Sequence, residues 1–142
     1  METGDVRRRV RRTIDNARAR AQERRRDVAA AEAEGTRALR VVATPLFRTV
    51  ASALKAEGYR FGVETPAGAV RLSPGGASED VIEIALDTTR DPPALMGRTA
   101  YVRGRRVLSD ERVVAEHPAL GDLAAEDVLD FVLSALAPMV ER

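Results

Sequence analysis

The first third of the chain contains almost nothing that interrupts a helix. No proline precedes Pro45, and no glycine lies between Gly4 and Gly35. The segment is rich in alanine, arginine and glutamate, which favour helix. Apolar or small side chains recur every three or four residues, the spacing of one buried helix face. Arg24 interrupts this stripe, whose members are Val6, Val10, Ile14, Ala17, Ala21, Val28, Gly35, Leu39, Val42 and Leu46.

Such a helix is longer than the rest of the protein is wide. At about 1.5 Å per residue, residues 5–42 would span about 57 Å. The remaining hundred residues would form a body roughly 30–35 Å across, from a radius of gyration of about 13 Å. We therefore predict a projecting association helix over residues 1–42 and a compact α+β domain over residues 43–142.

The projecting stripe is expected to be covered by a partner, since exposed valine and isoleucine forgo the free energy of burial. A second copy of the chain, paired in a coiled-coil-like homodimer, is the main interpretation, and another protein is also compatible. Fraying of the first twenty residues is the alternative. The residues predicted to mediate self-association are Val6, Val10, Ile14, Ala17, Ala21 and Val28.

A second, shorter helix is predicted after Thr44-Pro45. Thr44 would cap it and Pro45 would occupy its first position. Because the apolar face around Leu46, Phe47, Val50 and Leu54 is rotated from the first stripe, we expect a kink near Pro45. Gly58 should stop this helix after Glu57.

Residues 59–115 alternate between apolar and polar side chains, which predicts an antiparallel sheet of four to five strands. Tyr59, Phe61 and Val63 share one face of the first strand, and Pro66 and Gly68 suit a hairpin turn. Ile82, Ile84 and Leu86 would face the core. The last two strands would turn near Arg103-Gly104 or, alternatively, near Ser109-Asp110, and the segment 106–115 is a candidate edge strand.

A C-terminal helix follows, with Asp122 as its expected cap and Pro138 expected to end or kink it near Leu136. The predicted order is thus long helix, short helix, antiparallel sheet, helix, an α+β fold with helices on one sheet face. This order is similar to small secretion-chaperone-like folds, an analogy of fold that implies little about function.

Arginine is concentrated in the first helix. Ten arginines and four carboxylates lie between residues 5 and 27, a net charge of 10 − 4 = +6, whereas the whole chain carries +1. The least balanced part contains Arg7, Arg8, Arg9, Arg11 and Arg12, which could contact phosphates of a nucleic acid. However, the chain has only one lysine, so arginine is its ordinary cation, and a solvated helix face is the main interpretation.

Few features indicate catalysis. There is no cysteine, which excludes disulfides and thiolate metal ligands and suits a cytoplasmic setting. No apolar stretch approaches the roughly 18 residues of a membrane span, and we expect no signal peptide. His117 precedes Pro118 in a predicted turn. Asp80, Glu83, Asp87 and Asp91 could gather around a cation, but a wetted sheet surface is the favoured interpretation.

The sequence therefore predicts a non-enzymatic protein without a cofactor or metal. It would self-associate through its first helix and act as an adaptor, chaperone-like or scaffold component that binds another protein. An accessory nucleic-acid-binding protein is the alternative.

Overall fold

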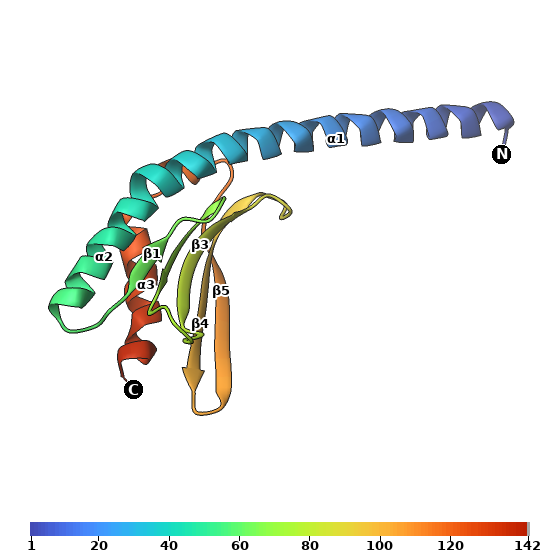
Figure 1. Ribbon diagram of the computed structural model, residues 1–142. Helices are drawn as coiled ribbons and strands as arrows, with labels where there is room; N and C mark the ends of the chain where they lie inside the picture. Colours follow the sequence, from blue (N-terminus) through green and yellow to red (C-terminus); the bar gives the residue numbers. More distant parts are fainter. Residues whose placement is uncertain (142) are drawn as a thin grey trace.

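The computed structural model describes residues 1–141. Residues 3–56 form one bent helical rod (Figure 1). Helix α1 (Thr3–Ala38) continues into a π-helical segment, η1 (Leu39–Ala43), and then into α2 (Thr44–Ala56). The predicted kink near Pro45 is confirmed as a bend of the rod, because the π-helical η1 ends two residues before Pro45. Gly58, at φ 90°, follows the rod, as predicted.

The predicted cap at Thr44 is wrong. Ala43 and Thr44 both have helical backbone angles, and no side chain caps α2. The helix never stops before Pro45, so there is no free N-terminus for Thr44 to cap. Pro45 therefore lies inside a continuous rod without an N–H to donate, and the π-helical segment η1 precedes it, an irregularity of the kind that accompanies helix bends.

Five strands form one sheet in sequence order, each antiparallel to its neighbours. This confirms the predicted α+β class. The strands are β1 (Gly62–Glu64), β2 (Ala69–Ser73), β3 (Val81–Asp87), β4 (Ala94–Arg103) and β5 (Arg106–Glu116).

Glycines with positive φ lie in the hairpin turns. Gly68 has φ 72°, and the N–H of Ala69 donates to the carbonyl of Pro66 at 3.0 Å, so the predicted first hairpin is confirmed. The last hairpin turns at Gly104, with φ 63°. The alternative turn at Ser109-Asp110 is wrong, because both residues lie inside β5, which forms one edge of the sheet. The first strand is shorter than predicted, since Tyr59 and Phe61 precede β1.

The C-terminal helix α3 (Ala125–Val140) begins and ends later than predicted. Asp122 belongs instead to a short 3-10 turn, η2 (Leu120–Asp122), and Ala124 precedes α3 without a side-chain cap. Pro138 lies inside the helix rather than ending it near Leu136. It lacks only the hydrogen bond that its own N–H would have donated to the carbonyl of Ser134, in the last turns of the helix.

The helices cover one face of the sheet and form the core against it. Figure 1 shows α2 and α3 on the same side of the strands. Ile82 and Ile84 point toward this side and are fully buried, as is Phe47 from α2. The end of α1 joins the core through small residues: Ala31 and Ala38 are buried, and so is Gly35. The N-terminal part of α1 extends beyond the body.

Gly97 on β4 lets α3 approach the sheet closely. A Cβ atom at this position would lie 2.6 Å from the ring of Phe131. That distance is well inside van der Waals contact, so the rigid ring must move if the glycine is replaced. The aromatic ring of α3 therefore packs directly on the backbone of the sheet.

We expect Gly97→Ala to lower the free energy of unfolding by about 1–3 kcal/mol, the usual cost of overpacking. Gly62→Ala in the same sheet is the matched control, because a Cβ there meets nothing within 4 Å. Urea unfolding of both variants checks this. Equal midpoints for the two variants would show that Phe131 does not constrain β4.

Candidate functional site

The first candidate surface is the projecting part of α1, residues 3–26, here called the arm (Figure 1). Three predicted association residues remain exposed on it: Val6 by 44%, Val10 by 52% and Ile14 by 44%. Ala17 is exposed as well, whereas Ala21 and Val28 are half-buried. Full burial begins only at Ala31. The arm therefore presents apolar side chains that its own body does not cover.

Arginines flank this apolar stripe. Val6, Val10 and Ile14 line a shallow surface groove together with Arg7, Arg11, Asp15 and Arg18. The five arginines predicted as anion contacts are all exposed. Within residues 1–141, Arg8 is the only one of these five in an ion pair, with Asp5. The arm thus combines an apolar line with uncompensated positive charge.

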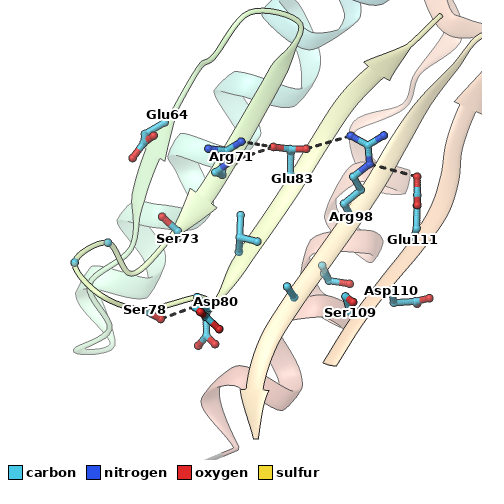
Figure 2. Close-up of a pocket in the computed structure, with 16 residues that line it drawn as sticks. Glu64, Arg71, Ser73, Ser78, Asp80, Glu83, Arg98, Ser109, Asp110 and Glu111 are labelled. Atoms are coloured by element: carbon cyan, nitrogen blue, oxygen red, sulfur yellow. Dashed lines mark hydrogen bonds and ion pairs between the residues drawn. The ribbon is translucent and has the colours of Figure 1, made fainter. Parts of the chain in front are cut away.

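The second candidate surface is the sheet face opposite the helices. Residues that pair across neighbouring strands share a face, and the register aligns one residue from each strand in a row of alternating charge. Figure 2 shows this row, which runs Glu64, Arg71, Glu83, Arg98 and Glu111 from β1 to β5.

Glu83 is at the centre of the row and is its least exposed member. Its Oε2 accepts from Arg71 Nη2 at 2.7 Å and from Arg71 Nε at 3.0 Å. Its Oε1 lies 3.5 Å from Arg98 Nη1. The side chain of Glu83 is only 13% exposed, against 41% for that of Arg98. Two guanidinium groups therefore compensate a carboxylate that water reaches poorly.

Arg98 links three strands through carboxylates. Besides Glu83, it contacts Glu111 on β5 at 3.3 Å and Asp87 on β3 at 3.7 Å. The pKa of Asp87 is lowered from its usual value near 3.8, mainly because the Thr89 hydroxyl and then the Thr89 N–H donate to its carboxylate. The positive charges of Arg98 and Arg90 lower it further. The ionised form of Asp87 beside Arg98 is therefore favoured.

A hollow of about 850 Å³, here called the sheet groove, contains this row. Val81 and Ala100 lie beside the row and are partly exposed. The loop before β3 forms one wall and is anchored by Asp80, a residue that is 1% exposed and whose carboxylate accepts from the N–H of Val102 at 2.9 Å. The carboxylates outnumber the arginines in the lining by six to two: Glu64, Glu79, Asp80, Glu83, Asp110 and Glu111 against Arg71 and Arg98.

Other predicted residues do not converge on this groove. Glu83 and Asp87 share the polar sheet face, as predicted, but both bind Arg98. No three carboxylate or histidine side chains within residues 1–141 are placed to hold a metal ion. His117 lies elsewhere, with its Nε2 3.4 Å from Asp27 Oδ1 at the base of the arm.

The charge row was missed in the sequence because it depends on register. Glu64, Arg71, Glu83, Arg98 and Glu111 are separated by 7 to 15 positions in the chain, and only strand pairing aligns them. The alternation of polar and apolar residues within each segment was the one available signal. It places each of these residues on the polar face of its own strand, but it does not show which residues of different strands become neighbours.

The fold is an α+β architecture with a long bent helix, a five-stranded antiparallel meander and a C-terminal helix. Comparison of the chain with protein-family models, with curated proteins and with solved structures finds no match. None of the helices within residues 1–141 is both long and apolar enough to span a membrane.

We expect Glu83→Gln to lower the free energy of unfolding by about 1–3 kcal/mol, because glutamine removes the charge that assists the hydrogen bonds from Arg71 and places an amide donor among guanidinium groups. Glu111→Gln removes a carboxylate whose side chain is 51% exposed, and should cost less than about 1 kcal/mol. Chemical unfolding at neutral pH measures both. A Glu83 variant as stable as the Glu111 variant would contradict a central role for Glu83.

Proposed function

We propose that this protein is a non-enzymatic, self-associating adaptor or scaffold component. It would form a homodimer through the arm and bind another protein with the surfaces of its body. The observation that carries the proposal is the exposure of Val6, Val10 and Ile14 on a helix that projects from its own domain.

Energetic reasoning supports association through this stripe. Burial of each valine or isoleucine is worth about 1.5–3 kcal/mol, and the arm forgoes this as long as it stands alone. The 24 residues 3–26 form about 36 Å of helix in which no residue is fully buried. Alanines at positions 17 and 21 add little area, so we expect a dimer of modest affinity.

The rest of the molecule also favours binding over catalysis. In the sheet groove, Glu83 and Glu111 are fixed in ion pairs with Arg71 and Arg98, and the remaining acidic charge is spread over separate carboxylates. The only histidine, His117, contacts Asp27 and does not line the groove. A concave polar sheet face with fixed charges is suited to recognising a partner surface of complementary charge.

Val10→Asp/Ile14→Asp should weaken self-association at least tenfold, since two carboxylates would replace the centre of the apolar stripe. The matched control is Ala19→Asp/Gln22→Asp, which adds the same charge on exposed positions away from the stripe. Sedimentation velocity across a concentration series measures both. A wild-type protein that stays monomeric throughout would refute the proposed homodimer.

Nucleic-acid binding is the second candidate function. It is favoured by the exposed arginines of the arm, of which four of the five at positions 7, 8, 9, 11 and 12 have no ion pair within residues 1–141. The arm has no aromatic side chain for base stacking, so recognition would rely on phosphates.

If this second function holds, random-sequence DNA should bind at 50 mM salt and lose about 10²–10³-fold in affinity at 200 mM salt. Changing Arg7, Arg8, Arg9, Arg11 and Arg12 to glutamine should abolish binding. Changing Arg18, Arg20, Arg25 and Arg26 instead should retain most of it. Fluorescence anisotropy measures these affinities, and absence of binding at 50 mM salt would exclude the function.

A further inference from the structure

We infer that the sheet groove receives the arm of a second copy of this chain. This inference rests on the proposed self-association and names its receiving surface: the arm would dock on the partner's sheet rather than on the partner's arm. Three features of the two surfaces support it, namely charge, apolar pattern and width.

The charges are complementary. Residues 5–27, which span most of the arm, carry ten arginines and four carboxylates, a net charge of +6. Of the carboxylates that line the groove, Asp80 is buried, and the register pairs Asp110 with Thr99 on the helix-covered face. The other four, Glu64, Glu79, Glu83 and Glu111, stand against Arg71 and Arg98, a net charge of 2 − 4 = −2. Two arms laid side by side would instead bring two strongly positive surfaces together, and like charges in close contact oppose association.

The apolar patterns also correspond. Beside the charge row, the register aligns Val81 with Ala100 on the same face, and Val102 with Val107 two residues further along. Val107 is 49% exposed. These four side chains form an apolar strip next to the carboxylates. The stripe of the arm, Val6, Val10 and Ile14, likewise has arginines beside it.

The widths agree as well. Glu64 on β1 and Glu111 on β5 are separated by four strand spacings, about 19 Å at roughly 4.8 Å each. A helix with its side chains is about 10–12 Å across. An arm lying in the groove therefore leaves room for arginines on both sides of its stripe to reach carboxylates at both rims.

The arm cannot dock in its own groove. It continues without a break into the part of α1 that is buried in the core, and the helix leads away from the body (Figure 1). A second copy supplies the missing arm. If each copy docks its arm in the sheet groove of the other, the two equivalent contacts form a closed dimer with twofold symmetry.

A complementation experiment tests this arrangement. The groove variant is Glu64→Lys/Glu79→Lys, in which both residues are exposed and neither forms an ion pair within residues 1–141. The arm variant is Val10→Asp/Ile14→Asp. We expect each variant alone to self-associate at least tenfold more weakly than the wild type. An equimolar mixture should form a 1:1 heterodimer, because one intact arm can still meet one intact groove.

The control Glu57→Lys/Glu141→Lys makes the same charge change at the ends of α2 and α3, outside the groove, and should associate like the wild type. Sedimentation velocity with one fluorescently labelled component measures all mixtures. A groove variant that associates like the wild type would overturn the inference but leave the proposed homodimer intact. A monomeric wild type would refute the proposed homodimer itself.

Cysteine cross-linking gives a second readout that does not depend on charge reversal. The chain has no cysteine of its own. We expect a Val10→Cys chain mixed with an Ala100→Cys chain to give mainly the disulfide-linked heterodimer under mild oxidation. Predominant cross-linking of Val10→Cys to itself would show arm-to-arm pairing and would overturn the inference.

Discussion

The close packing of small residues at the end of α1 determines where the rest of the molecule can lie. Ala31, Gly35 and Ala38 are buried there, and a Cβ on Gly35 would lie 2.7 Å from the side chain of Leu86 on β3. The helix backbone therefore lies almost directly on the sheet. Because α1 is continuous, this contact also fixes the direction in which the arm leaves the body.

The two faces of the sheet have opposite chemistry for a simple reason. Successive side chains of a strand point to opposite faces. On β3, Ile82 and Ile84 therefore point beneath the helices, and Glu83 between them points to the other face, where it lies between Arg71 and Arg98. The same alternation thus builds both the core and the charge row. A change of register by one residue would exchange the two and bury charge against α2 and α3.

The sequence was sufficient for the fold class, because both periodicities are strong: a three-to-four residue repeat over the first helix and alternation over the strands. Local ends were predicted less well. Thr44 and Asp122 have the side chains of helix caps, but the helix at Thr44 never starts afresh, and Asp122 lies in a separate turn. Capping propensity describes a residue at a helix end and does not determine where the end falls.

Of the two candidate surfaces, one could be predicted from the sequence and the other could not. The exposed stripe of the arm could be predicted, because it depends on helix geometry and on a length greater than the body. The sheet groove could not be, because Glu64 and Glu111 face the same hollow only after four strand pairings have formed.

One consequence of the continuous rod concerns mechanics. The arm, η1 and α2 are parts of a single bent lever whose fulcrum is the buried end of α1. A tilt of about 5° at this fulcrum would move the tip of a 36 Å arm by about 3 Å, given the helical rise per residue. At the other end of the lever, α2 lies against β1 and β2. A force on the arm would therefore be transmitted through α2 to β1, the edge of the sheet opposite β5.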